Sequence, residues 1–87
     1  MESELVMELV PNPASNQVLV DVHGLGQSGG TLVMFDLLGK ELMVKTLDAG
    51  VQHAQFTLSL QGLAMGNYLI KVKTDNEVQT KTLIIVK

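Results

Sequence analysis

Residues 51–60 read Val51-Gln52-His53-Ala54-Gln55-Phe56-Thr57-Leu58-Ser59-Leu60. From position 53 onward, polar residues at the odd positions alternate with apolar residues at the even positions. A period of two places successive side chains on opposite faces of a β-strand. This stretch therefore predicts a strand with one buried face and one wet face.

The same alternation occurs on either side of this stretch, around Val20 and around Ile70. In the second case, Tyr68 and Val72 share the predicted buried face with Ile70. Further strands are predicted, from the same pattern, at Leu5–Val10, Thr31–Asp36, Glu41–Leu47 and Glu77–Val86.

Turn-forming residues separate these strands at short intervals. They are Pro11-Asn12-Pro13, Gly24–Gly30, Leu38-Gly39-Lys40, Asp48-Ala49-Gly50, Gly62–Gly66 and Asp75-Asn76. Glycine supplies positive φ angles in such turns, and proline withholds a ladder donor. About seven short strands with frequent turns predict an all-β Greek-key sandwich.

Length and composition predict one folded domain over residues 1–87, with residues 1–4 a linker remnant or an appended start outside it. The hydrophobic fraction of 46% excludes a disordered tail. A net charge of −3 without basic clusters excludes nucleic-acid binding and a polybasic membrane anchor. No apolar run is long enough to insert in a membrane, and the acidic start lacks the features of a signal peptide.

Few residues suggest chemistry. Gly24-Leu25-Gly26-Gln27-Ser28-Gly29 matches the dinucleotide fingerprint, but the fingerprint needs a helix to follow, whereas Thr31–Phe35 predicts a strand. A flexible loop is the preferred interpretation. His23 and His53 belong to no spaced ligand cluster and are interpreted as surface histidines. With no cysteine and no nucleophile–base pair, we expect no catalytic site, no metal and no cofactor.

The last strand is unusual because it is apolar on both faces. Lys81-Thr82-Leu83-Ile84-Ile85-Val86-Lys87 closes the chain. It is compatible with a central strand covered on both sides, and equally with an exposed strand that a partner binds, for example by strand addition. With only three aromatic residues, methionines are expected to fill the core.

Three further segments complete a recognisable order. Val10-Pro11-Asn12-Pro13-Ala14-Ser15-Asn16 stands first, Phe35-Asp36-Leu37-Leu38-Gly39-Lys40-Glu41 follows, and Leu63–Val72 leads into the terminal Lys81–Lys87. In this order and spacing, the chain resembles the type A C-terminal sorting domain of the type IX (Por) secretion system, from about Leu9 to Lys87.

This resemblance implies an immunoglobulin-like sandwich at the end of a larger cargo protein of a Gram-negative bacterium. It implies that the precursor crosses the periplasm, that shuttle proteins and the outer-membrane translocon read the domain, and that a surface sortase then removes it. The cargo would finish at the cell surface or secreted, and the domain would not be an enzyme.

Carried over by position, the resemblance marks recognition residues in three places. They are Gly39 and Lys40, then Gly66 and Tyr68, then Lys81, Leu83, Ile84, Ile85, Val86 and Lys87. A structural role in turns is preferred for Gly39 and Gly66, and the last strand is the better recognition candidate.

Two other kinds of protein fit the sequence less well. An adhesion or carbohydrate-binding module would usually expose aromatic rings for stacking on sugars, and this chain has few rings. A passive spacer would gain nothing from an apolar terminal strand.

Overall fold

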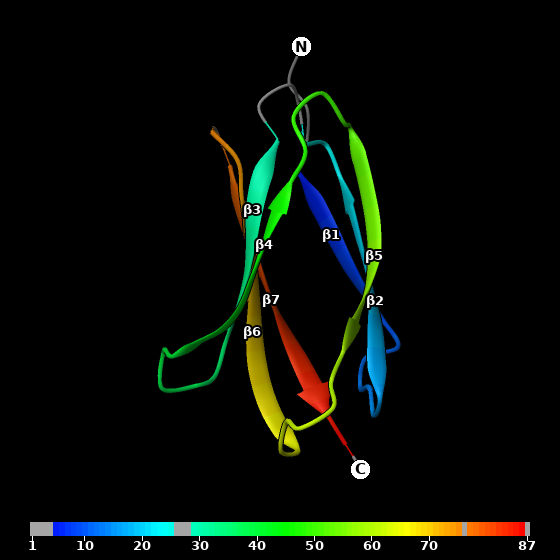
Figure 1. Cartoon of the computed structure of the whole chain (residues 1–87), viewed down its shortest axis with the longest axis vertical. Coiled ribbons are helices and arrows are strands. Elements are labelled where there is room, and N and C mark those ends of the chain that lie inside the picture. Colours follow the sequence, from blue (N-terminus) through cyan, green and yellow to red (C-terminus); the bar gives the residue numbers. More distant parts are fainter. Residues whose placement is uncertain (1–4, 26–28, 76, 87) are drawn as a thin grey trace.

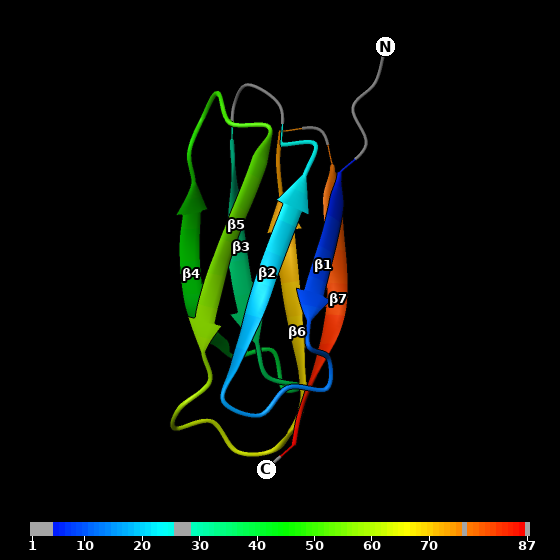
Figure 2. The same ribbon diagram turned by 90° about the vertical axis from the view of Figure 1, so that its right-hand side faces the viewer.

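The computed structural model describes residues 5–25, 29–75 and 77–86. These residues form two layers of antiparallel β-sheet, which face each other across the core (Figures 1 and 2). The strands are β1 (Val6–Val10), β2 (Gln17–His23), β3 (Gly30–Phe35), β4 (Glu41–Leu47), β5 (His53–Ser59), β6 (Gly66–Lys73) and β7 (Val78–Ile85).

One sheet has the order β1-β2-β5, and the other has the order β4-β3-β6-β7. The chain crosses between the sheets after β2, β4 and β5. This is the immunoglobulin arrangement with one change, because the fourth strand joins the sheet of the third strand instead of the sheet of the fifth. The predicted all-β sandwich of seven antiparallel strands is confirmed, and the five strands with predicted bounds each begin and end within two residues of those bounds.

The core consists of the inward-facing residues of both sheets. In β2 and β6 every second side chain is buried, as the period of two predicts. The innermost side chains, each less than 2% exposed, are Leu5, Met7, Val18, Val20, Val22, Leu32, Met34, Leu60, Ile70, Val72, Leu83 and Ile85. The expectation that methionines fill the core is confirmed for Met7 and Met34, which are fully buried, and is wrong for Met65, which is 68% exposed.

Successive strands run in opposite directions, so the connections alternate between the two ends of the sandwich. The turns after β1, β3 and β5 lie at the end where β7 finishes, which we call the C-terminal end (Figure 2). The connections after β2, β4 and β6 lie at the other end, where β1 begins. We call that second end the N-terminal end.

Candidate recognition site at the C-terminal end

The terminal strand β7 lies at the edge of the four-stranded sheet and pairs with β6 along its whole length. Leu83 and Ile85 are buried in the core, while Ile84 is 38% and Val86 46% exposed. The two apolar faces of this strand therefore have different roles. One closes the sandwich, and the other faces outward, where a partner could contact it.

The outer edge of β7 is covered at its end by the segment that follows β1. The Ile84 N–H donates to Asn12 Oδ1 at 3.0 Å, and Asn12 Nδ2 donates to the Thr82 carbonyl at 2.8 Å. The Ala14 N–H donates to the Ile84 carbonyl, and the Val86 N–H donates to the Ala14 carbonyl, each at 2.8 Å. We call Asn12–Ala14 the latch, because it occupies the polar groups that strand addition would need here.

Gly66 and Tyr68 lie directly beside the terminal strand, since Gly66 pairs with Ile85 and Tyr68 with Leu83. The Tyr68 ring is buried, and its hydroxyl donates to the Ala64 carbonyl at 2.5 Å. A tyrosine that bonds back to the preceding backbone at this point is the tyrosine corner of immunoglobulin-like domains. Tyr68 thus fixes the crossing from β5 to β6, and only 8% of the residue is exposed.

The turn between β3 and β4 projects from the C-terminal end, at the lower left of Figure 1. One oxygen of Asp36 accepts hydrogen bonds from the Leu38 and Lys40 N–H groups, both at 2.9 Å. Gly39, at φ 90°, supplies the left-handed conformation that closes this turn. These hydrogen bonds define the backbone conformation of the turn, and its tip presents exposed side chains to solvent.

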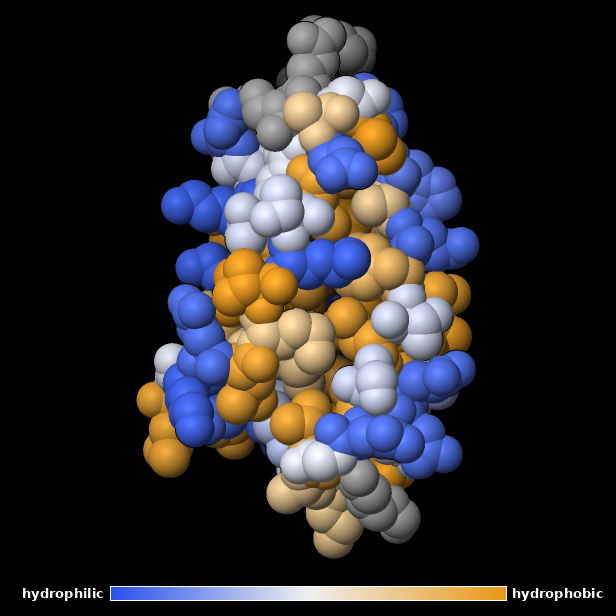
Figure 3. All heavy atoms as spheres, in the orientation of Figure 1, coloured by the Kyte–Doolittle hydropathy of each residue, from blue (hydrophilic) through white to orange (hydrophobic). Residues whose placement is uncertain are grey.

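Those exposed side chains are apolar. Leu38 is 94% exposed and Leu37 63% exposed, and apolar atoms stand out at this corner of the molecule in Figure 3. Lys40, next to them, is also exposed. Among the described residues no segment covers this tip. An apolar tip with an adjacent positive charge is the kind of surface that a protein partner can bind.

A shallow groove of about 420 Å³ runs from this turn over the outer face of the four-stranded sheet. Its apolar walls come from Phe35, Leu37, Leu69 and Val78. It therefore extends from the turn across β6 and reaches β7 at Val78 and Thr80, in the first half of that strand. Ile84 and Val86, at the other end of the strand, do not line this groove.

Lys81 lies in the middle of β7, opposite Ile70, and is exposed. Residues 81, 83 and 85 lie on the same face of β7, so Lys81 is on the inward-facing side of an edge strand, together with Leu83 and Ile85. Such a charge discourages pairing with another chain. Lys87, which the resemblance also marks, lies outside the described residues.

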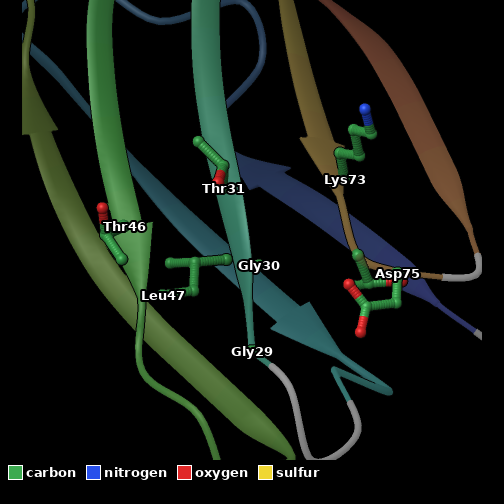
Figure 4. A pocket seen from close by; sticks show the side chains of 8 residues that line it. Gly29, Gly30, Thr31, Thr46, Leu47, Lys73 and Asp75 are labelled. Carbon is green, nitrogen blue, oxygen red and sulfur yellow. The ribbon is translucent and has the colours of Figure 1, made fainter.

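The glycine-rich stretch has a packing role at the N-terminal end (Figure 4). A Cβ at Gly29 would lie 2.4 Å from the Leu47 carbonyl oxygen, and one at Gly30 would lie 2.5 Å from the Lys73 carbonyl oxygen. Strand β3 begins at Gly30, where the dinucleotide fingerprint requires a helix. Residues 26–28 of that motif are not described. The two glycines are explained by close backbone contact.

The comparison with family models assigns the chain to a known family of domains. The model of the secretion system C-terminal sorting domain matches residues 8–86. The chain belongs to this family. The match spans almost the whole chain and identifies a type IX sorting domain, as the resemblance predicted. A comparison with curated proteins gives no match.

As a type IX sorting domain, the chain is a C-terminal sorting signal, and its family is noncatalytic. Membership of this family implies a cargo precursor that carries the domain and associates with the secretion machinery. It also implies secretion to the cell surface or the extracellular space. Within the described residues, no helix is long and apolar enough to span a membrane.

Two features of the sorting domain do not follow from the sequence pattern. The sequence around Asn12 predicts only a turn, because the strand that the latch contacts lies about 70 residues away. His23 and His53, expected as separate surface residues, are stacked with ring centroids 4.0 Å apart. The only sequence signal for this pair is that each histidine occupies a position on the polar face of its predicted strand.

Proposed function

We propose that the sorting domain is recognised at its C-terminal end, through the β3–β4 turn and the outward face of the terminal strand. The recognition surface comprises Leu37, Leu38 and Lys40, with Ile84 and Val86. The observation that carries this proposal is the hydrogen-bonded turn whose tip exposes Leu38 at 94%. Gly39 and Gly66 shape the turns, while Tyr68, Leu83 and Ile85 hold the surface from inside.

The layout of the chain supports this proposal. Leu5 enters β1 at the N-terminal end, so a cargo domain joined there would stand a full strand length away from the recognition surface. The outer-membrane translocon or its shuttle proteins could then contact the surface without displacing the cargo. Passage through the periplasm precedes this step, and removal by a surface sortase follows it, with cleavage on the cargo side of the domain.

A carbohydrate-binding module is disfavoured by the placement of the aromatic rings. Tyr68 is buried, and Phe35 and Phe56 are half-buried. The Lys45 amine lies 5.0 Å from the centre of the Phe56 ring. Sugar stacking needs a broad open ring face, and the two rings that reach the surface, Phe35 and Phe56, are each half-buried and line different pockets.

The test is secretion of a reporter that carries a signal peptide and this chain at its C-terminus, in a host with a type IX system. Leu38→Ser with Lys40→Ser alters the turn, and Ile84→Thr with Val86→Thr alters the terminal strand. All four side chains are exposed, so each double variant should keep the fold. Circular dichroism and a thermal unfolding curve of each purified chain check this.

Val44→Thr is the matched control, because Val44 is 56% exposed but lies on β4, away from the C-terminal end. We expect the control to be exported like the parent and both double variants to accumulate in the periplasm. Export of both folded variants at the parental level would overturn the proposed surface, while leaving the family assignment intact.

A further inference from the structure

Two histidines meet on the outer face of the three-stranded sheet, at the N-terminal end. The register of β2 and β5 places His23 directly opposite His53. Asp21 precedes His23 by two residues and therefore lies on the same face. The last residue of β2 and the first of β5 are thus brought together with a carboxylate beside them.

The three side chains converge on one point. His53 Nε2 contacts Asp21 Oδ1, and His23 Nε2 lies 3.4 Å from the same oxygen. The imidazole rings are stacked with an interplanar angle of 11°. One potential ligand atom from each of the three residues lies within 4.8 Å of the others.

We propose that Asp21, His23 and His53 form a binding site for one divalent transition-metal ion with the ligand preferences of zinc. Two imidazole nitrogens and one carboxylate oxygen are a donor set that suits zinc, copper and nickel, while magnesium and calcium prefer oxygen ligands alone. The site is independent of the proposed recognition surface, which lies at the other end of the sandwich.

The spacing suits a single ion. Two nitrogens bound at about 2.1 Å in tetrahedral geometry are roughly 3.4 Å apart. His23 Nε2 already lies 3.4 Å from Asp21 Oδ1, the separation that two ligands of one ion need. His53 Nε2 and Asp21 Oδ1 are in direct contact, so an ion would replace that contact and these two atoms would move apart to admit it. The imidazoles are about half exposed and Asp21 is 22% exposed, so an ion could enter from solvent and keep water in its open position.

The surroundings favour a cation. Glu8 on β1 lies opposite Asp21, which adds a second carboxylate to this part of the face. Gln55 on β5 is the other neighbour of Asp21. A bound ion would tie β2 to β5 where the Gly24 N–H already donates to the Gln52 carbonyl at 2.9 Å. Metal binding would therefore stabilise the folded domain at the end that a cargo joins.

The test is urea unfolding of the whole chain with and without zinc sulfate, together with a calorimetric titration. If zinc binds only the folded state, free zinc at 100 times its Kd lowers the unfolding equilibrium constant about 100-fold. His23→Gln and His53→Gln should each weaken zinc binding by roughly 10-fold or more. Thr57→Ala, on the same face of β5 but paired with Leu19 and away from the three ligands, is the matched control and should behave like the parent.

The stoichiometry and the choice of ion sharpen the test. One zinc per monomeric chain, with no comparable effect of magnesium, supports the site. Half a zinc per chain in a zinc-linked dimer would overturn it, because the ligands would then come from two copies. Equal zinc stabilisation of the parent and both histidine variants, or none in the parent, would also overturn it.

Discussion

The side chain of Asn12 binds the backbone of Ile84 in the way that a neighbouring strand would. Its amide oxygen accepts a hydrogen bond from the Ile84 N–H at 3.0 Å, and its amide nitrogen donates one to the Thr82 carbonyl at 2.8 Å, at the free edge of β7. The terminal strand of the domain is therefore paired on one side and closed at its end on the other. Strand addition at residues 82–86 would require release of the latch.

Asn12→Ala should lower the free energy of unfolding by about 1–2 kcal/mol, since it removes two hydrogen bonds worth about 0.5–1.5 kcal/mol each. Chemical denaturation measures this change. Hydrogen exchange at the Ile84 amide should become faster. Asn16→Ala, in the same connection, is the control and should change neither quantity. An unchanged Ile84 exchange rate in Asn12→Ala would show that the latch does not protect the edge.

Leu83→Ala should lower the free energy of unfolding by about 2–5 kcal/mol, because it leaves a cavity in the core. The neighbouring side chain of Ile84 points outward, so Ile84→Ala should lower the free energy of unfolding by less than about 1 kcal/mol. Urea denaturation of both variants makes the comparison. Similar losses in the two would contradict the assignment of opposite faces.

Because Leu83 is buried and Ile84 faces outward, deletions and outward-facing substitutions in the terminal strand test different things in a secretion assay. An 87-residue domain has a total stability of about 4–13 kcal/mol. Deletion of the last five residues removes both Leu83 and Ile85 from the core. Lost export after such a deletion would report unfolding as readily as lost recognition, so outward-facing substitutions are the informative ones.

Asp36→Ala should loosen the β3–β4 turn, because the Leu38 and Lys40 N–H groups lose their shared acceptor. We expect a loss of about 1–2 kcal/mol and reduced secretion of a reporter that carries the variant. Asp36→Asn keeps an acceptor oxygen and should restore most of both. Secretion of Asp36→Ala at the parental level, with the turn amides exchanging faster, would show that a fixed turn is not needed.

Gly29→Ala and Gly50→Ala distinguish the cost of a steric clash of the new Cβ from the cost of a positive φ angle. Both glycines have positive φ, at 72° and 83°, but a Cβ at Gly29 meets the Leu47 carbonyl, whereas one at Gly50 meets open space. Gly50→Ala should cost about 1–2 kcal/mol and Gly29→Ala at least about 3 kcal/mol. Thermal unfolding compares them, and equal costs would remove the close contact as the reason for this glycine.

The sequence predicted the strands and the buried faces well, because both depend on neighbours along the chain. Tyr68 illustrates the value of this local information. The alternation placed it on the buried face with Ile70 and Val72, and the structure agrees. The family resemblance marked the same residue for recognition, and this stays a prediction for a residue that is 8% exposed.

The pairing of distant segments could not be predicted in the same way. Nothing near Asn12 in the sequence indicates that its amide would meet Ile84, and nothing near His23 indicates that the ring opposite would be His53. The strand order and the register decide such contacts, and they depend on the packing of both sheets.

The sequence by itself determined an all-β domain, the residues of its core, its turns and its family. These follow from local alternation, backbone preferences and the order of motifs. Only the tertiary structure decided that β7 is an edge strand closed by Asn12, that the turn at Leu38 and the outward face of Ile84 share one end, and that Asp21 meets both histidines. Those relations join segments far apart in the chain, and sheet pairing, which is not local, fixes them.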